Sequence, residues 1–526
     1  MLKKYCHSID EAFRNTVEQY PDKEAIIFRG NKLTFAELEE QVDKLAGGLY
    51  SKGVRRQDRV IIYLPHMPQW IVIWLALQRI GAVAVPVTHF YGHAELSYIA
   101  KDSGAETVFC ADTNLGQAIK ASASSSLKRI IVVGSIDLTE FEESNMEKTD
   151  ILTFESFLSN HIPSLPTVKI AGKDTAEILY TGGTTGVPKG VPIPNMSFLE
   201  AITESRKASE SLVPLSEAIT IQGAPLNHIF GQEVGLGALL SGDTLILLPR
   251  LELDDLLFHI EKYRATTLFG TPTLCKMILD YDQLDNYNLD SLLYVFTGGE
   301  ALPVEVLKRW FQRFGKHLYH GYGSSETCGA ISLIPAGEPF PEGTAGKIIS
   351  TKKIKLVNPD TLEPVSSVEP GELLVSSENM VTRYWNNPEE TARHFINLYG
   401  CLWYKTGDIV KIDSEGWVFF VDRSVDLIKH KGYRVAATKV EAVLYKHNVV
   451  GECCVVGVPD ARVGEKIKAF VVLKAGVGDV TAEDLIKWCS ENLSSYEVPH
   501  CIEFRNTLPK SAVGKLLRRK LRDEER

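Results

Sequence analysis

Strand-like and helix-like segments alternate through residues 1–135, and this alternation constrains the fold more than any other feature of the chain. Short apolar runs predict strands, and most are followed by a stretch whose apolar residues recur every three or four positions, as on one face of a helix. Strands that alternate with helices build βαβ units, whose strands run parallel in one sheet. The predicted strands are 59–64, 83–87, 107–110 and 129–133.

Local signatures predict where individual helices begin. Thr34 and Glu37 have the spacing of a capping box, in which each side chain satisfies a backbone N–H that the first helical turn leaves without a partner. Ser197 and Glu200 repeat this spacing and predict a second helix start. A third predicted helix has Pro303 at its first position and a buried face formed by Leu307, Trp310, Phe311 and Phe314.

Composition excludes several classes of protein. A chain of 526 residues is too long for one ordinary hydrophobic core, so we expect two or more domains. The net charge of −10 argues against broad nucleic-acid binding. The nine cysteines are scattered without a Cys-x-x-Cys pair, which argues against a disulfide framework or a zinc site and favours a reducing, cytoplasmic location.

Apolar segments near the start of the chain, such as 70–77, are too short to cross a bilayer. The first residues also lack the apolar core of a signal peptide. We therefore expect a soluble protein without an integral membrane segment, and its oligomeric state stays open.

The stretch 180–191, Tyr-Thr-Gly-Gly-Thr-Thr-Gly-Val-Pro-Lys-Gly-Val, follows a predicted buried strand at 176–180. Its glycines let backbone amides approach an oxyanion, its threonines add hydroxyl donors, and Lys189 adds a positive charge. It differs from the Walker A pattern, because Pro188 and Gly190 flank the lysine and disfavour a helix start there. The stretch is either a phosphate-binding loop or a structural turn between two strands.

Two further glycine-containing turns follow predicted strands. The turn 298–300 follows the strand 292–297, and the turn 321–327, Gly-Tyr-Gly-Ser-Ser-Glu-Thr, follows the strand 317–320. The carboxyl ends of neighbouring parallel strands meet at one edge of a sheet, where ligands bind in open α/β folds. Beside a candidate phosphate loop, this matched placement favours a nucleotide site.

The last third of the chain has a different organisation. Short alternating segments after residue 346 predict a small antiparallel sheet or barrel, in which Asp408 could bind ribose hydroxyls or cap a turn. A charged run at 422–432 predicts a domain boundary between residues 421 and 422. Beyond it we expect a compact α+β domain, with the basic run 516–522 as a solvated helix face.

In their order and spacing, these stretches resemble the adenylate-forming superfamily. It comprises acyl- and aryl-CoA synthetases, the adenylation domains of peptide synthetases and beetle luciferases. The resemblance covers essentially the whole chain, and it rests on the stretches 180–191, 321–327, 404–408, 422–432 and 509–515.

The fold that the resemblance implies is α/β. A large N-terminal domain at 1–421 would combine parallel α/β sheets with a small β-barrel-like subdomain. A small, mobile α+β C-terminal domain at 422–526 would carry the adenylation lysine and the loop on the CoA side.

The resemblance also implies roles for single residues. Lys515 would bridge the substrate carboxylate and the α-phosphate, Glu326 would hold Mg²⁺, and His228 would lie near the reacting carboxylate. The implied ATP-binding residues are Thr181, Gly182, Gly183, Thr184, Thr185, Gly186, Lys189, Gly299, Glu300, Ala301, His320, Gly321, Tyr322, Gly323, Ser324, Ser325, Asp408 and Arg423. The implied acid pocket comprises His228, Ile229, Phe230, Gly298 and Gly323, and the implied CoA-binding residues are Lys431, Gly432 and Tyr433.

A few positions depart from the pattern of the superfamily. Val425 stands at the hinge position, where aspartate or lysine is usual, and this difference could alter the domain rotation. Ser325 stands where threonine is more common and keeps the hydroxyl. Ala437 replaces a common proline, and Arg383 replaces the glycine that usually precedes Tyr-Trp.

The activity that the resemblance implies is that of an acyl-CoA synthetase. Such an ATP-dependent carboxylic acid:CoA ligase forms an acyl-adenylate and releases AMP and pyrophosphate, using ATP, Mg²⁺ and coenzyme A. Ile229 and Phe230 predict an apolar pocket, which makes acetate a poor candidate. The stretch 91–105 resembles fatty-acid CoA ligases, which favours a medium- or long-chain fatty acid. An aromatic or alicyclic acid is the alternative, because the run 299–303 is also seen in benzoate-type ligases.

Three other functions are less favoured. A stand-alone amino-acid adenylation domain usually has an aspartate in the region 225–230, and this chain has none there. A nucleotide sensor without activity would be expected to have lost Lys515 or Glu326, and both are present. A luciferase-like oxygenase is not excluded by motif, but it is a rare branch of the superfamily.

Overall fold

The computed structural model divides into two compact units, Met1–Lys353 with Val375–Tyr404, and Ile354–Leu374 with Lys405–Arg526. The domain boundary expected between residues 421 and 422 stays a prediction. The structure describes residues 6–135, 149–159, 167–181, 188–366, 369–423, 426–431, 433–460, 462–474, 480–510 and 516–525.

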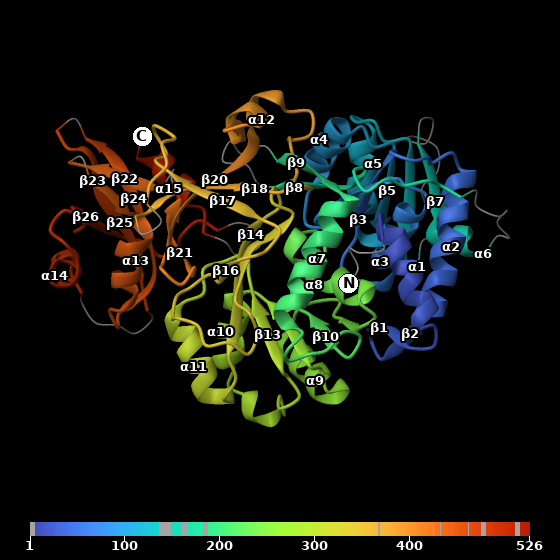
Figure 1. The fold of residues 1–526 in the computed structure, drawn as a ribbon, viewed down its shortest axis with the longest axis horizontal. Helices are drawn as coiled ribbons and strands as arrows, with labels where there is room; N and C mark the ends of the chain where they lie inside the picture. The colour runs from blue at the N-terminus through green and yellow to red at the C-terminus, as the bar shows by residue number, and fades with distance from the viewer. Residues whose placement is uncertain are drawn as a thin grey trace. The chain divides into compact units, whose positions relative to one another are not determined.

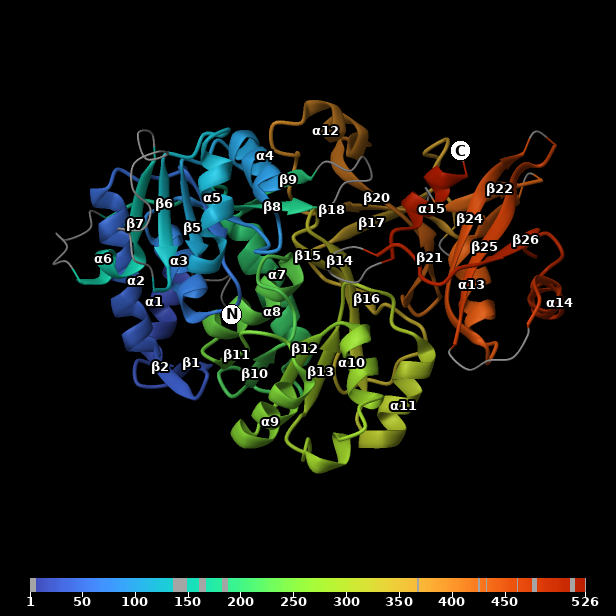
Figure 2. The ribbon, with the colours of Figure 1, turned by 180° about the vertical axis from the view of Figure 1, so that it is seen from behind.

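The strands predicted from the alternating pattern form one sheet of the larger unit, in the order β7-β6-β5-β3-β4-β8-β9. The pairs β3–β4, β3–β5 and β5–β6 are parallel, which confirms the predicted βαβ arrangement. Figure 2 shows β5, β6 and β7 side by side. The bounds are β3 Arg59–Tyr63, β4 Val83–Pro86, β5 Thr107–Ala111, β6 Arg129–Val133, β7 Asp150–Thr153, β8 Thr175–Thr181 and β9 Lys189–Pro194.

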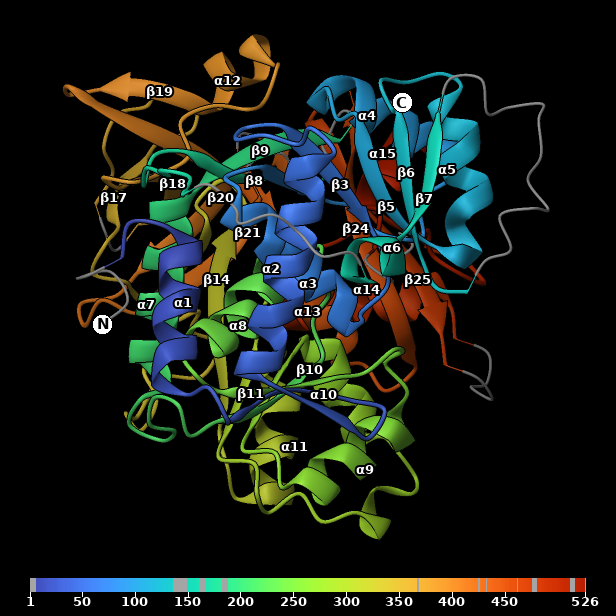
Figure 3. The same ribbon diagram turned by 90° about the vertical axis from the view of Figure 1, so that its right-hand side faces the viewer.

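Helices α1, α2 and α3 pack against one another beside this sheet (Figure 3). Thr34 caps α2 through the predicted capping box with Glu37. Every residue of α3 from Trp70 to Arg79 is buried, so this helix forms the centre of the core rather than its surface. The bounds are α1 Ile9–Gln19, α2 Phe35–Ser51, α3 Pro68–Arg79, α4 His93–Ser103, α5 Leu115–Ser122, α6 Phe154–Ser159 and the 3₁₀ helix η2 Asp112–Asn114.

A second sheet of the larger unit has the order β16-β15-β14-β13-β12-β10-β11-β1-β2. Its central strands are parallel, whereas β2, β15 and β16 pair antiparallel at the two edges. The bounds are β1 Glu24–Phe28, β2 Asn31–Thr34, β10 Ile219–Gln222, β11 Thr244–Leu247, β12 Thr267–Gly270, β13 Tyr294–Thr297, β14 Leu318–Ser324, β15 Gly329–Leu333 and β16 Lys347–Ile348.

Helices α7 and α8 lie side by side in the larger unit (Figure 1). The α8 helix is buried along almost its whole length, from Ile229 to Leu240. The bounds of the remaining helices in this unit are α7 Asn195–Ser209, α8 Ile229–Leu240, α9 Leu253–Tyr263, α10 Pro272–Leu279, α11 Val304–Phe314, α12 Pro388–His394 and the 3₁₀ helix η4 Leu284–Asn286.

Two helix predictions were wrong in detail. The α7 helix starts at Asn195, and Ser197 instead donates a hydrogen bond to the carbonyl of Asn379, so it does not cap the helix. In α11, Pro303 is the N-cap residue rather than the first helical residue. Phe311 of α11 is 48% exposed and stacks on the ring of His317, so it does not belong to the buried face.

The turn predicted at 321–327 is also shorter than expected. Strand β14 continues through Ser324 and forms an antiparallel hairpin with β15, with Gly323 opposite Ala330. Glycine is required there because a Cβ at Gly323 would lie 2.2 Å from the carbonyl oxygen of Gly329. The two backbones therefore approach more closely than side chains allow, and the strand extends through the motif.

A third sheet has the order β17-β18-β20-β19, with β21 paired with β20. The pairs β19–β20 and β20–β21 are antiparallel, as predicted for this part of the chain. The bounds are β17 Lys353–Val357, β18 Gly371–Ser376, β19 Phe395–Leu398, β20 Cys401–Ile412 and β21 Val418–Arg423.

The rest of the smaller unit is an α+β structure, as expected from the sequence. Its sheet has the order β23-β22-β25-β24, and β26 pairs with β25. The bounds are β22 Leu427–His430, β23 Tyr433–Ala436, β24 Val450–Asp460, β25 Gly464–Leu473, β26 Cys501–Phe504, α13 Ala437–Tyr445, α14 Ala482–Asn492 and α15 Arg518–Glu524.

The basic helix α15 is only partly the solvated face that the sequence predicted, because two of its arginines form ion pairs within the unit. Arg518 forms ion pairs with Asp426 (2.9 Å) and Glu441 (2.6 Å), and Arg522 pairs with Asp426. The side chains of these ion pairs are largely buried. Leu521, on the same helix, is buried in an apolar cluster of the smaller unit.

Two further expectations concern the whole chain. All nine cysteines fall within the described residues and none forms a disulfide. In the ranges that the structure describes, no helix is both long and apolar enough to span a membrane.

Candidate functional site

Part of the predicted site lies outside the described residues. The described residues do not include the hinge residue Val425. They also do not include the glycines and threonines of the phosphate loop, the adenylation lysine or one residue of the CoA loop. These predicted site residues are Gly182, Gly183, Thr184, Thr185, Gly186, Gly432 and Lys515.

The residues that flank the glycine-rich stretch belong to two paired strands. Strand β8 confirms the predicted strand at 176–180, and it pairs antiparallel with β9 so that Thr181 lies opposite Lys189. In the smaller unit, Lys510 and Leu516 form an antiparallel bridge on either side of the segment that contains Lys515. Both predicted loops therefore begin and end at paired backbone positions.

Lys189 belongs to a connected set of charged and aromatic side chains. Its Nζ pairs with the carboxylate of Glu390 on α12 and lies 5.1 Å from the centre of the Tyr384 ring. The Tyr384 hydroxyl donates a hydrogen bond to Oε1 of Glu326 over 2.9 Å. This set brings the end of the glycine-rich hairpin and the predicted Mg²⁺ ligand together in the larger unit.

The charges in this set influence one another. The hydrogen bond from Lys189 is the main reason why the pKa of Glu390 is lowered, so Glu390 stays ionised at neutral pH. Burial, reinforced by the charge of Glu326, raises the pKa of the Tyr384 hydroxyl. Tyr384 therefore remains protonated and can donate to the carboxylate of Glu326.

Sequence reasoning missed Tyr384 and Glu390 as site residues. The Tyr-Trp pair that follows Arg383 was visible as part of the superfamily pattern, but its contact with Glu326 was not. Glu390 had no signal beyond its place in the first turn of a helix that Asn387 caps.

The turn that carries Glu326 is held by side chains on both sides. Ser324 and Thr327 cap each other's backbone N–H groups at 3.1 and 3.3 Å. Lys352 donates from Nζ to the carbonyl of Thr327 over 2.7 Å, although burial lowers the pKa of this lysine. Glu326 therefore projects from a fixed turn, and Lys352 is a third residue that the sequence did not reveal.

Several of the predicted ATP-binding residues lie at the ends of the parallel strands β13 and β14. Gly299 has a φ of +80°, a conformation that favours glycine, and Glu300 accepts a hydrogen bond from Thr273 over 2.7 Å. His320 pairs through Nδ1 with the Thr297 hydroxyl at 3.0 Å, and burial lowers its pKa to about 4. The His320 ring is therefore neutral at pH 7.

The predicted acid pocket begins at the first residues of α8. His228 is the exposed N-cap residue, Ile229 is buried and Phe230 is half-buried. The Phe230 ring lies 5.9 Å from that of Phe296 on β13, and a Cβ at Gly298 would lie 3.3 Å from Phe230. The start of α8 and the end of β13 thus share an apolar surface.

The smaller unit brings its own predicted residues together. Asp408 on β20 lies opposite Arg423 on β21, and the Arg423 Nε is 3.4 Å from Oδ1 of Asp408. Lys431 has a φ of +50° at the end of β22. Tyr433 is 54% exposed and stacks on Tyr496 with ring centres 4.4 Å apart.

The described residues would bind Mg²⁺ only together with a substrate that supplies phosphate oxygens. In the described ranges, no three or more His, Cys, Asp or Glu side chains gather into a group that could hold a metal ion. Mg²⁺ usually binds one or two carboxylates and completes its shell with water and substrate phosphates. A half-buried carboxylate such as Glu326 fits this mode.

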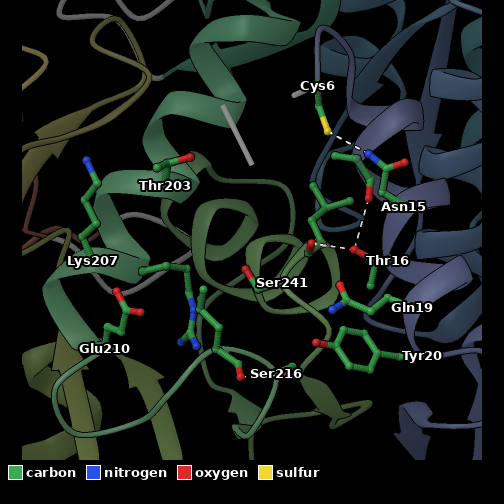
Figure 4. Close-up of a pocket in the computed structure, with 14 residues that line it drawn as sticks. Cys6, Asn15, Thr16, Gln19, Tyr20, Thr203, Lys207, Glu210, Ser216 and Ser241 are labelled. Carbon is green, nitrogen blue, oxygen red and sulfur yellow. Dashed lines mark hydrogen bonds between the residues drawn. The ribbon is translucent and has the colours of Figure 1, made fainter. Parts of the chain in front are cut away.

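A cavity of about 350 Å³ lies elsewhere in the larger unit, between α1, α7 and the end of α8 (Figure 4). Asn15, Gln19, Tyr20, Lys207 and Ser241 are among the residues that line it. None of the lining residues is a predicted site residue, so this cavity is separate from the chemistry described above.

Parallel strands whose carboxyl ends carry glycine-rich and charged motifs define a nucleotide-dependent α/β enzyme. The chain belongs to the AMP-binding enzyme family, whose model matches residues 13–385, and the AMP-binding enzyme C-terminal domain matches residues 439–515. It is an adenylate-forming enzyme of the acyl-CoA synthetase branch.

Similarity to individual proteins extends over the full length. A long-chain-fatty-acid–CoA ligase of Bacillus subtilis (strain 168) is 32% identical, over 98% of this chain and 94% of the relative. A solved anthranilate CoA ligase in complex with anthranoyl-AMP has a TM-score of 0.87 at 25% identity, covering 99% of this chain and 97% of that one. A benzoate CoA ligase from Burkholderia xenovorans LB400 has a TM-score of 0.84 at 26% identity, covering 98% and 100%.

Proposed function

We propose that this enzyme is an ATP-dependent carboxylic acid:CoA ligase that acts on an apolar acid, most simply a medium- or long-chain fatty acid. The observation that carries the proposal is the connected set Lys189, Glu390, Tyr384 and Glu326 beside the glycine-rich hairpin. Full-length similarity to a long-chain-fatty-acid–CoA ligase supports the acid class.

The first half-reaction joins the acid to AMP. A carboxylate oxygen would attack the α-phosphorus of ATP, the bond to the β-phosphate oxygen would break, and pyrophosphate would leave. Both reactants are anions, so the site must provide positive charge and oriented donors where negative charge gathers. We assign this role to Lys189, Lys515 and the backbone amides of the glycine-rich stretch.

The second half-reaction transfers the acyl group. The sulfur of CoA would attack the carbonyl of the acyl-adenylate, the bond to the AMP oxygen would break, and the thiol proton would pass to solvent or to a nearby base. We assign the CoA side to Lys431, Gly432 and Tyr433, and ribose binding to Asp408 and Arg423. We further place the reaction in the reducing cytosol, which suits a thiol substrate and nine free cysteines.

Glu326 is the residue we assign to Mg²⁺. When bound, the ion supplies positive charge beside the phosphates of the nucleotide. Tyr384 would orient the Glu326 carboxylate by donating to Oε1.

A benzoate-type acid is the second candidate. It is favoured by similarity to solved anthranilate and benzoate CoA ligases and by the aromatic surface that Phe230 shares with Phe296. A flat ring packs well against such a surface, whereas a long chain needs a channel beyond it.

The test is AMP release by the purified enzyme with ATP and Mg²⁺ against straight-chain, alicyclic and aromatic acids, each with and without CoA. A CoA-dependent signal that peaks with chain length supports the fatty-acid assignment. A peak on a ring acid supports the second candidate. Adenylation of amino acids without CoA turnover, or no AMP with any acid, contradicts the ligase proposal.

A further inference from the structure

Three histidines follow strands whose carboxyl ends border the predicted acid site. His66 follows β3 and His89 follows β4, and these two strands are parallel neighbours in one sheet. His228 follows β10 in the other sheet of the larger unit. Of these residues only His228 is among the site residues that the resemblance to the superfamily implies.

One hydrogen bond joins these two sheets at their carboxyl ends. The backbone N–H of Leu226 donates to Nε2 of His66 over 3.0 Å. Leu226 is fully buried and lies in the turn that ends at His228, whose own N–H donates to the carbonyl of Pro225. An imidazole nitrogen accepts only when it carries no proton, so His66 is neutral with its proton on Nδ1.

The same turn is held from the other side by α8. Gln232 donates from Nε2 to the carbonyl of Leu226 over 2.9 Å, and its backbone N–H donates to the carbonyl of His228. A Cβ at Gly231 would lie 2.0 Å from the carbonyl oxygen of Pro225, so the turn and the helix are in backbone contact. Both polar backbone groups of Leu226 are therefore fixed by side chains.

The surroundings keep His66 in the form that the bond requires. Burial, followed by the charges of His89 and His228, lowers the pKa of His66 to about 4. Burial also lowers the pKa of His89. At neutral pH the Nε2 lone pair of His66 therefore remains available to the N–H of Leu226.

We propose that His66 is a positioning residue for the acid-activating step: through Leu226 it fixes the turn that sets the place of His228 and of the first residues of α8. The inference rests on the proposed function, because it assigns the acid to that part of the site. His66 acts through the backbone and need not touch the substrate.

Two substitutions separate this role from simple packing. The amide oxygen of His66→Gln falls near the position of Nε2 and can accept from Leu226, whereas the shorter side chain of His66→Asn cannot reach it. We expect His66→Asn and His66→Ala to raise KM for the acid about tenfold, since small misplacements at a reacting centre have effects of this size or larger. KM for ATP should change less than twofold, and His66→Gln should resemble the wild type.

A second measurement needs no turnover. Hydrogen exchange of the peptide that contains Leu226 should be faster in His66→Ala and His66→Asn and close to wild type in His66→Gln. His259→Ala, which removes a half-buried imidazole on α9, is the matched control and should change neither exchange nor KM.

The outcomes distinguish the two proposals. Equal loss in His66→Gln and His66→Ala, or equal effects on KM for the acid and for ATP, would overturn the positioning role. Unchanged hydrogen exchange at Leu226 in His66→Ala and His66→Asn would also overturn the positioning role, and this measurement does not require an active enzyme. Failure of the wild type to release AMP with any acid would contradict the proposed function alone.

Discussion

Tyr384 illustrates how a single side chain can connect parts of a site that are far apart in sequence. Its ring lies beside the Lys189 ammonium, and its hydroxyl donates to Glu326. The contact with Lys189 requires only the ring, whereas the hydrogen bond to Glu326 requires the hydroxyl oxygen. A single substitution can therefore remove the hydrogen bond and keep the ring contact.

Tyr384→Phe tests this arrangement. It should raise the Mg²⁺ concentration needed for half-maximal AMP release about tenfold or more, because loss of one hydrogen bond to a charged group costs about 1.5 kcal/mol or more. Tyr281→Phe removes an exposed hydroxyl that donates to Asp254 and serves as the control. An unchanged Mg²⁺ titration in Tyr384→Phe would show that the hydroxyl does not orient Glu326.

Glu177 is a residue whose effect on stability depends on pH. It is fully buried, accepts a hydrogen bond from Trp74 over 3.1 Å, and burial raises its pKa to about 8. Between its unfolded pKa, about 4.3, and pH 8, the folded protein holds a proton that the unfolded chain releases. The stabilisation that Glu177 gives by holding this proton is fully present below about pH 4.3 and is lost as the pH rises to about 8.

Glu177→Gln removes this titration while keeping an acceptor for Trp74. The melting temperature of the variant minus that of the wild type should increase from pH 5.5 to pH 8.5 by about 3 °C, because the wild type loses about 3 kcal/mol over this range. A difference that is constant with pH, measured by calorimetry at both values, would mean that Glu177 is ionised in the folded protein.

At the scale of elements, two sequence signatures with the same spacing each predicted a capping box, but only one of them caps a helix. The capping box at Thr34 is present, because its hydrogen bonds with Glu37 lie at the surface, where solvent offers no stronger partner. The same spacing at Ser197 does not cap α7, because Asn379 accepts from Ser197 and donates to Glu200 over 2.8 Å. A local signature therefore held where no distant segment competed for its side chains.

Helix α15 gives a test at this scale. Arg518→Met would leave Glu441 as a largely buried carboxylate without its cation, while Asp426 would keep its pair with Arg522. We expect the variant to destabilise the smaller unit by about 3 kcal/mol. Its neighbour Arg519 forms only an exposed pair with Asp523, so Arg519→Met should change stability by less than about 0.5 kcal/mol.

Limited proteolysis across a denaturant series would follow the smaller unit in both variants. Equal protection of α13 and α15 in the two proteins would show that the ion pairs of Arg518 contribute nothing beyond those of a surface arginine.

At the scale of the whole molecule, the two units carry different parts of the proposed chemistry. The larger unit holds Lys189, Glu326 and the start of α8, whereas the smaller unit holds Asp408 and Arg423. The segment that contains Lys515 also belongs to the smaller unit. The two half-reactions should therefore respond differently when one unit is altered.

Lys515→Ala should slow acyl-adenylate formation by about a hundredfold or more, since only that step would use the charge of the lysine. Thioester formation from a supplied acyl-adenylate should be largely spared. Lys510→Ala removes a lysine of the same segment that pairs with Glu452 on the surface and is the matched control. Equal losses in both half-reactions, measured by single-turnover quench, would argue against this role.

The sequence by itself determined the fold class, the order of the motifs and most element positions. These features are local or periodic: apolar spacing shows whether a segment is a strand or a helix, and glycine shows where backbones must approach closely. The parallel strands β3, β4, β5 and β6 could be read from this pattern to within a residue or so.

Only the tertiary structure decided which side chains meet. Lys189 and Glu390 are separated by 201 positions, Leu226 and His66 by 160, and Tyr384 and Glu326 by 58. A hydrogen bond requires donor and acceptor within about 3 Å, and no local pattern records which distant residue folding will bring to that distance. The chemistry of the motifs could therefore be predicted from the sequence. Which residues hold those motifs in place was determined by how the sheets and helices pack.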